Sequence, residues 1–80
     1  MEKKSLKIKL FGIVAEKTGT NNFTISFTDD TDKLYSLLLK EYPQLEGIKF
    51  VFAVNRKIVH QNTLLSTNDE IALLPPFSGG

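Results

Sequence analysis

Only one segment of this sequence has the apolar spacing of a helix that can cover a sheet. Within residues 28–43, apolar side chains recur three and four positions apart and form one stripe, which consists of Leu34, Leu37, Leu38 and Tyr42. Positions 29–32 offer several N-cap candidates, and the sequence leaves open which of them is the cap. Pro43 predicts that the helix stops near Tyr42. One helix can cover only one face of a sheet, so the other apolar segments must be arranged around it.

The remaining apolar segments have the patterns of strands. Leu6, Ile8 and Leu10 alternate with lysines, and the strand that they begin is predicted to run to Val14. Gly19 and two asparagines then mark a turn, so the first two strands are predicted to form a hairpin. Proline cannot donate to a strand ladder and therefore ends the last strand. The predicted strands cover residues 6–14, 23–27, 50–55, 58–60 and 70–75.

The order of these elements predicts the fold. Two strands, a helix and three strands follow one another, and the first and last strands are the most apolar. We therefore place these two strands side by side and parallel in the centre of a mixed sheet of four to five strands. With one main helix lying diagonally across one face, the fold class is α+β, a β-grasp or ubiquitin-like roll. We expect this domain to cover residues 1–76 and a flexible tail to cover residues 77–80.

The composition argues against several classes of function. The chain has 80 residues and a formal net charge of +1, which gives no broad electrostatic footprint for nucleic acid. It has no cysteine, so disulfides, thiolate metal sites and cysteine nucleophiles are excluded. No apolar run approaches the ~20 residues of a membrane span, and no signal peptide is recognisable near the start. We expect a soluble cytoplasmic protein with no membrane partner.

The predicted sheet has more apolar surface than one helix can cover. Phe11 and Ile13 continue the side of the first strand that carries the lysines, and the later strands are also apolar on both sides. Loops can cover part of this second face. Several adjacent exposed apolar side chains mark an interface. We therefore expect a hydrophobic docking surface for another protein around Phe11 and the strand leading to Pro75.

The most distinctive chemical group is the carboxylate at the end of the chain. His60 is the only histidine and is expected to face solvent, and no carboxylate pair, metal-ligand cluster or glycine-rich nucleotide loop is recognisable. Gly79 and Gly80 make a slim terminus that can enter a narrow channel. Pro75 and Pro76 favour an extended exit, which lowers the entropy lost when the tail is inserted.

The tail can also reach a site inside another protein. Extended, residues 77–80 span roughly 13 Å, and Phe77 can anchor the base of the tail in an apolar pocket. A carboxylate becomes reactive when ATP converts it to an acyl-adenylate on a separate enzyme, and a persulfide could then leave a thiocarboxylate on Gly80. Terminal glycines also occur by chance, but here they follow a last strand, two prolines and an aromatic residue.

Three segments make this sequence resemble a known family from about Leu6 to Gly80. They are "KIKLFGIVAEKTGT", "FAVNRKIV" and, most specifically, "TNDEIALLPPFSGG". The chain resembles the small subunits of molybdopterin synthase, the MoaD family of ubiquitin-like sulfur carriers. Gly79 and Gly80 match the terminal diglycine of that family, and Pro75, Pro76 and Phe77 match its pre-tail segment. Phe77 departs from the small aliphatic residue that is more frequent at its position.

The resemblance implies a specific role in molybdenum cofactor biosynthesis. An E1-like, ATP-dependent enzyme of the MoeB type would adenylate Gly80, and a sulfur donor protein would complete its conversion to a thiocarboxylate. Ser78 and Gly79 would thread the tail into a MoaE-like large subunit, and Phe11 with Pro75, Pro76 and Phe77 would help to dock it. Sulfur from two carriers would then turn cyclic pyranopterin monophosphate into the molybdopterin dithiolene. The assembly implied is a heterotetramer of two small and two large subunits.

In this role the chain itself needs no bound cofactor or metal and no catalytic side chain of its own. Three other functions remain open at this stage. One is a ThiS-like sulfur carrier for thiamine thiazole synthesis, which shares the fold and the ending but is usually shorter and lacks the double proline. Another is a ubiquitin-like modifier whose terminal glycine is joined to lysines of other proteins. The third is a binding module in which the two terminal glycines have no chemical role.

Overall fold

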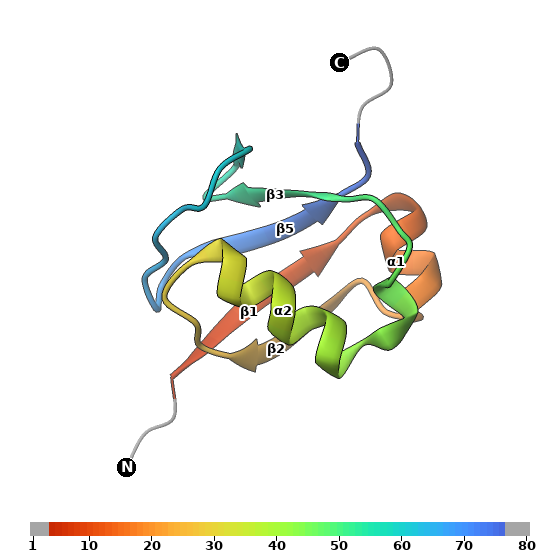
Figure 1. The fold of residues 1–80 in the computed structure, drawn as a ribbon, viewed down its shortest axis with the longest axis horizontal. Coiled ribbons are helices and arrows are strands. Elements are labelled where there is room, and N and C mark those ends of the chain that lie inside the picture. Colours follow the sequence, from red (N-terminus) through yellow and green to blue (C-terminus); the bar gives the residue numbers. More distant parts are fainter. Residues whose placement is uncertain (1–3, 77–80) are drawn as a thin grey trace.

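A five-stranded mixed sheet forms the centre of the protein, in the strand order β2-β1-β5-β3-β4 (Figure 1). The computed structural model describes residues 4–76. The strands are β1 (Ser5–Leu10), β2 (Asn22–Ser26), β3 (Val51–Val54), β4 (Lys57–Val59) and β5 (Glu70–Leu74). β1 and β5 are parallel neighbours in the middle of the sheet, and the other pairs are antiparallel. The predicted β-grasp topology and its parallel central pair are confirmed.

The main helix lies where the apolar stripe predicts it. α2 (Thr31–Glu41) crosses one face of the sheet, and a single turn of 3-10 helix, η1 (Pro43–Leu45), follows it. Asp30 is the N-cap, because its side chain accepts a hydrogen bond of 2.9 Å from the backbone N–H of Lys33. Proline occupies the first position of η1, so the α-helix ends before it, as predicted.

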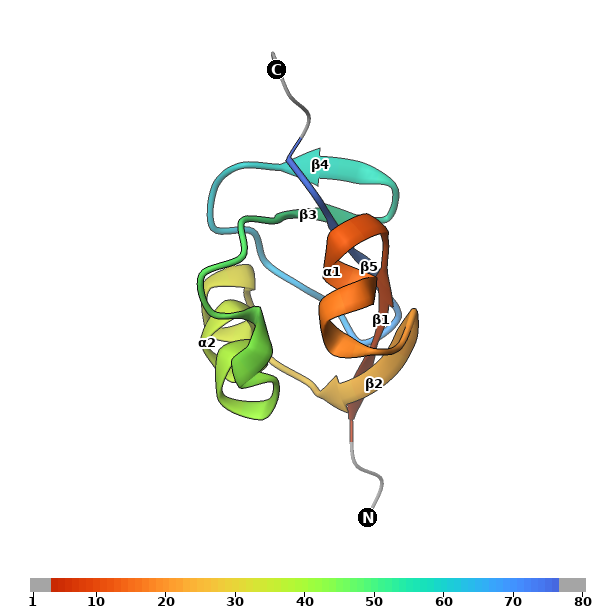
Figure 2. The same cartoon turned by 90° about the vertical axis from the view of Figure 1, so that its right-hand side faces the viewer.

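The prediction that the first strand continues to Val14 is wrong. β1 ends at Leu10, and α1 (Gly12–Thr18) follows it over the end of the sheet at which β1 and β5 terminate (Figure 2). Gly12 has φ +60°, a left-handed conformation that breaks the extended chain. Since β5 itself ends at Leu74, before Pro75, residues after Phe11 also have no strand beside them to pair with.

The predicted hairpin is therefore corrected as well. β1 and β2 are antiparallel neighbours, but α1 lies within their connection, which is longer than a turn of glycine and asparagine. Gly19, with φ 77°, ends α1 instead of forming a hairpin turn. The bounds of β2, β3, β4 and β5 each differ by one residue at most from the predicted bounds.

One hydrophobic core fills the space between the sheet and the helices. Leu34 and Leu38 of the predicted stripe are fully buried, whereas Leu37 and Tyr42 pack at its edge. Val14, expected in a strand, reaches the core from α1 and closes one end of it. The buried core consists of Leu6, Ile8, Leu10, Val14, Ile25, Leu34, Leu38, Leu45, Leu65, Ile71 and Leu73. Within residues 4–76, no helix has the length and apolar character needed to cross a membrane.

Candidate functional site

Strand register identifies the residues on the face of the sheet that α2 leaves uncovered. Ala72 and Leu74 alternate with the buried Ile71 and Leu73, and the Cα pairing places the alternate residues of β3 and β4 beside them. Phe11 follows the buried Leu10 in extended backbone, so alternation directs its side chain to the same side. We call this group the second face, and it consists of Phe11, Val51, Ala53, Ile58, Ala72 and Leu74.

The second face occupies β5, β3 and β4. On the same side of the sheet, β1 and β2 carry polar residues. Phe11 is 48% exposed and Ile58 is 38% exposed. On the same side of β1, Lys7 and Lys9 are exposed, and Lys9 forms an ion pair of 3.4 Å with Glu70. The second face is therefore a partly exposed apolar patch with a basic margin, which is a usual composition for a protein interface.

The strand that was expected to place Ile13 on this surface with Phe11 ends at Leu10. Ile13 lies in α1 and not in a strand, so the alternation of β1 no longer determines where its side chain points. It is 43% exposed. The helical turn after Gly12 therefore ends the strand alternation from which a shared face was expected.

The fold holds Phe11 beside the segment that leaves the last strand. The backbone N–H of Phe11 donates a hydrogen bond of 3.2 Å to the carbonyl oxygen of Leu73. A Cβ atom on Gly12 would stand 3.0 Å from Cγ of Pro75, so the absence of a side chain at residue 12 lets the Pro75 ring pack against it without strain. The second face is thus continuous with the exit of the C-terminal segment.

Only part of the predicted tail site lies in the region that the structure describes. Pro75 is half-buried against the start of α1, and Pro76 is exposed. Phe77, Ser78, Gly79 and Gly80 lie outside the described residues, so their predicted roles stay predictions. Docking through Phe11, Pro75 and Pro76 also stays a prediction, although the structure brings these three residues to one end of the sheet.

The one carboxylate–ammonium contact of α2 is a surface feature. The Lys33 ammonium lies 2.9 Å from the Asp29 carboxylate. Their hydrogen bond, and then their attraction, lower the pKa of Asp29 and raise the pKa of Lys33. Among residues 4–76, no group of three or more histidine, cysteine, aspartate or glutamate residues could hold a metal ion.

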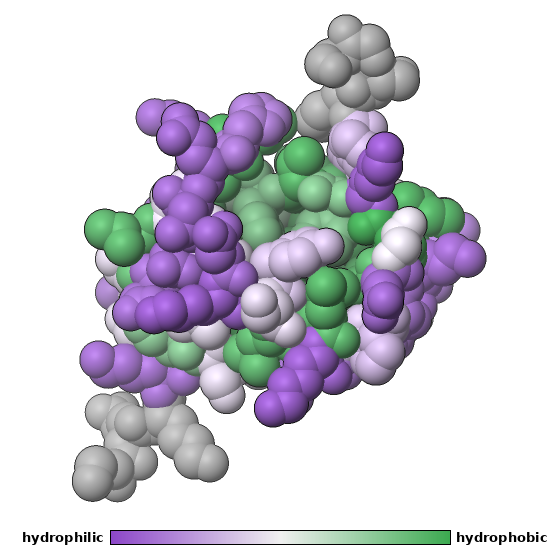
Figure 3. All heavy atoms as spheres, in the orientation of Figure 1, coloured by the Kyte–Doolittle hydropathy of each residue, from purple (hydrophilic) through white to green (hydrophobic). Residues whose placement is uncertain are grey.

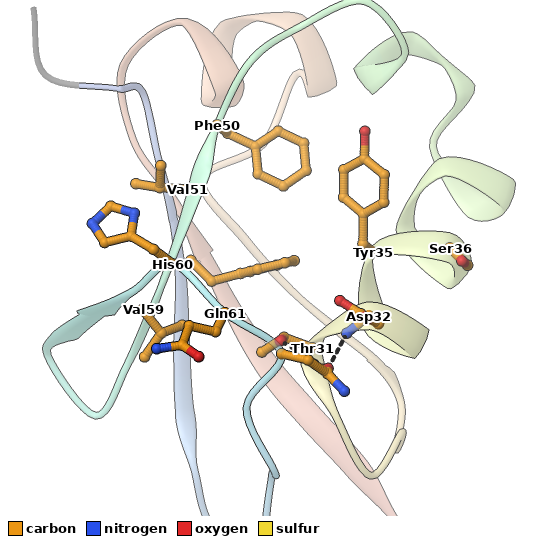
Figure 4. Close-up of a pocket in the computed structure, with 11 residues that line it drawn as sticks. Thr31, Asp32, Tyr35, Ser36, Phe50, Val51, Val59, His60 and Gln61 are labelled. Atoms are coloured by element: carbon orange, nitrogen blue, oxygen red, sulfur yellow. Dashed lines mark hydrogen bonds between the residues drawn. The ribbon is translucent and has the colours of Figure 1, made fainter.

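A second feature of the surface was not expected from the sequence. Asp32, Tyr35 and Ser36 lie on one side of α2, three and four residues apart, and line a hollow together with Phe50 and His60 (Figure 4). The spacing of the aspartate, tyrosine and serine could have indicated a second helix face. Their partners Phe50, before β3, and His60, after β4, could not be identified because those segments are distant in sequence.

Comparison with known proteins assigns the chain to a family. The model of the ThiS family matches residues 8–80. The chain belongs to the ThiS family. The match to this family begins in β1 and extends through Pro75 and Pro76 to Gly80, so it includes the second-face strands and the whole terminal segment.

Members and structural neighbours of the family resemble this chain over nearly all of its length. The molybdopterin synthase sulfur carrier subunit of Dictyostelium discoideum is 36% identical over an alignment of 81 positions. The alignment covers 92% of this chain and 94% of that protein. A chain in the complex of subunits 1 and 2 of the molybdopterin-converting factor from Helicobacter pylori 26695 is 30% identical, with a TM-score of 0.68 and coverage of 95% and 99%. Small archaeal modifier protein 1 from Methanosarcina acetivorans is 29% identical, with a TM-score of 0.72 and full coverage of both chains.

Proposed function

We propose that this protein is the sulfur carrier subunit of a molybdopterin synthase and that Gly80 carries the sulfur. The observation that most favours this function is the similarity to curated molybdopterin synthase sulfur carrier subunits, at 36% identity over 92% of the chain in one case. The ThiS family match supports it because the match extends to Gly80. The sulfur must come from outside, since the chain has no cysteine.

The chemistry begins at the terminal carboxylate. An E1-like enzyme binds ATP, and the Gly80 carboxylate attacks its α-phosphorus, releasing pyrophosphate and leaving an acyl-adenylate. A persulfide of a sulfur donor protein then attacks the acyl carbon and expels AMP. A second thiolate attacks the inner donor sulfur and breaks the S–S bond, which leaves the thiocarboxylate on Gly80 and a disulfide on the donor side. ATP is thus a substrate of the partner, and the carrier binds no cofactor.

Two features of the fold support docking of a partner beside the end of β5. β5 leads directly into Pro75 and Pro76, and Phe11 lies beside that exit on the second face. A large subunit that covers the second face would therefore receive Ser78, Gly79 and Gly80 in its own pocket, with Phe77 at the entrance. The Helicobacter pylori neighbour, which belongs to a complex of two molybdopterin-converting factor subunits, supports a partner of this kind.

In the full reaction the large subunit holds cyclic pyranopterin monophosphate, and this chain delivers sulfur to it. A dithiolene contains two sulfur atoms, so two charged carriers must react for each product molecule. We propose an assembly of two small and two large subunits in the cytoplasm. In this assembly the large subunit provides the catalytic side chains, and the small subunit contributes the activated acyl group.

The mass of the intact chain tests this function. Incubation with a MoeB-type enzyme, ATP and a persulfide donor should replace one oxygen atom of the chain by sulfur, as measured by intact-protein mass spectrometry. A variant with one alanine added after Gly80 is the matched control, because its terminal carboxylate lies one residue further along the chain and belongs to a residue with a side chain. An unchanged mass of the natural chain, under conditions in which the enzyme consumes ATP, would contradict the carrier function.

A role as a protein modifier is a second candidate, favoured by the likeness to small archaeal modifier protein 1. In that role the activated Gly80 would form amide bonds with lysines of other proteins. Peptide mapping of the same reaction, with and without the large subunit, separates the two functions. Sulfur transfer to the pterin without lysine conjugates supports the carrier, whereas conjugates without transfer support the modifier.

A further inference from the structure

A hollow of about 550 Å³ lies between α2 and the start of β3, on the side of the sheet opposite the second face. Figure 3 shows it as a recess with a hydrophobic floor and a hydrophilic border. Its volume falls in the range of small-molecule and side-chain binding sites. Val51 is the one residue of the second face that also lines the hollow.

Aromatic rings form the floor of the hollow. Tyr35 from α2 and Phe50 from the segment before β3 point toward one another, with ring centroids 5.6 Å apart. The ring of Phe52 meets Phe50 edge-on, also at 5.6 Å. Tyr35 is 45% exposed although it packs against Phe50, so part of its ring remains accessible. The faces of aromatic rings are electron-rich and attract cations.

The charge of the hollow is negative. Among the described residues that line it, Asp32 is the only aspartate or glutamate, and no lysine or arginine is present. Within residues 4–76, Asp29 is paired with Lys33 and Glu70 with Lys9, whereas no ammonium or guanidinium lies in ion-pair range of Asp32. A phosphate or nucleotide would therefore meet the Asp32 carboxylate and no lysine or arginine among these lining residues, so the hollow suits a positively charged ligand.

The wall of the hollow is fixed before any ligand arrives. The segment after β4 is held to the first turn of α2, because the backbone N–H of Asp32 donates a hydrogen bond of 2.9 Å to Oδ1 of Asn62. The backbone N–H of Thr31 donates to the carbonyl oxygen of Thr63, and the Thr63 N–H donates to Oγ1 of Thr31, both at 2.9 Å. A preorganised site loses less entropy on binding than one that must be assembled.

The hollow also adjoins the strand that leads to the tail. Val51 lines it through β3 and pairs with Leu74 of β5, the residue before Pro75. A protein that receives the tail and reaches around β4, the edge strand beside β3, would therefore place its own side chains within reach of the hollow. Guanidinium is the cation that best matches this site, because it is planar, stacks on aromatic rings and pairs with a carboxylate through two donors.

We propose that the hollow binds an arginine side chain of the large subunit, stacked on Tyr35 and Phe50 and paired with Asp32. This assignment of the partner rests on the proposed function, whereas the affinity of the hollow for a guanidinium does not. The contact would add a second attachment point on the α2 side of the carrier. It would fix the orientation of the carrier as the tail enters.

The affinity of the hollow can be measured on the isolated full-length chain. Titration of the ¹⁵N-labelled protein with acetyl-Gly-Arg-Gly-amide should give saturable shifts of the amide signals of Asp32, Tyr35 and Phe50. The citrulline peptide, which has the same shape without the charge, should bind at least about fivefold more weakly. Absence of saturable shifts at the hollow, or equal binding of the citrulline or lysine peptide, would overturn the guanidinium site.

Substitutions then test the residues and the partner. Asp32→Asn and Tyr35→Leu should each weaken peptide binding about fivefold or more, while Glu46→Gln, which removes an exposed carboxylate outside the hollow, should not. Asp32→Asn and Tyr35→Leu should also lower the affinity for a purified large subunit, and Glu46→Gln should not. Unchanged peptide affinity in Asp32→Asn and Tyr35→Leu overturns the site, and unchanged large-subunit affinity overturns the partner. The titration requires no sulfur on Gly80, so a failed thiocarboxylate assay would not affect it.

Discussion

Gly12 is the residue on which the geometry at the ends of β1 and β5 depends. It ends β1, begins α1 and allows Pro75 to lie against the backbone beside Phe11. Its φ of +60° is unfavourable for a residue with a Cβ atom, and the same Cβ would stand 3.0 Å from Cγ of Pro75. Two separate requirements, one conformational and one steric, therefore apply to this single position.

Replacement of Gly12 by alanine should lower the free energy of unfolding by about 2–3 kcal/mol, because backbone strain and the contact with Pro75 add together. Urea unfolding followed by circular dichroism measures the loss. Gly19→Ala is the matched control: its φ is 77°, but no atom lies within 4 Å of the added Cβ. The control should lose only about 1 kcal/mol. Equal losses in the two variants would show that the contact with Pro75 has no energetic weight.

Lys33 and Asp29 offer a prediction about titration at the start of α2. Since Lys33 lowers the pKa of Asp29, Lys33→Met should return that pKa toward its ordinary value, as measured by NMR of the Asp29 carboxyl carbon. A lowered folded-state pKa stabilises the fold above the unfolded-state pKa, and this contribution is lost as the pH falls through the folded-state value.

The matched control for this titration is Lys40→Met, which removes a lysine from the other end of the same helix. It should leave the pKa of Asp29 as it is in the natural chain. The stability difference between the natural chain and Lys33→Met should also disappear in acid, once Asp29 is protonated in both. An unchanged pKa in Lys33→Met would mean that the ion pair is absent in solution.

At the scale of elements, α2 could be predicted and α1 could not. α2 is long enough for a stripe with helical spacing to appear, and it has an acidic cap and a proline after it. α1 has only seven residues, and Phe11 and Ile13 continue the alternation of β1. Its helical state is decided by the conformation of Gly12 and by the end of β5, a strand that is remote in sequence.

The candidate site divides in the same way. The terminal glycines, the two prolines and the apolar strand before them are contiguous, so the sequence alone could indicate a tail that leaves the sheet. The hollow is built from α2, the segment before β3 and the segment after β4, and its wall depends on hydrogen bonds between Thr31 and Thr63. Contacts between remote segments of this kind leave no local pattern in a sequence.

For the molecule as a whole, the sheet separates two surfaces that meet at the exit of the tail. The core and α2 lie on one side of β5, and the second face lies on the other side. β5 contributes to both and then leads into Pro75, so a partner that grips the tail can contact either side. Because Phe11 and Ile58 are exposed on the second face and Phe11 lies beside the exit at Pro75, this face should provide most of the affinity for the large subunit.

Phe11→Lys tests that expectation, because it places a charge within the proposed interface, beside Pro75, at a position that is 48% exposed. The fold should be retained, and the affinity for the large subunit should fall about tenfold or more in isothermal titration calorimetry. Ile13→Lys is the matched control, since Ile13 is 43% exposed but belongs to α1 and not to the second face. An unchanged affinity in Phe11→Lys, or an equal loss in Ile13→Lys, would place the docking surface elsewhere on the molecule.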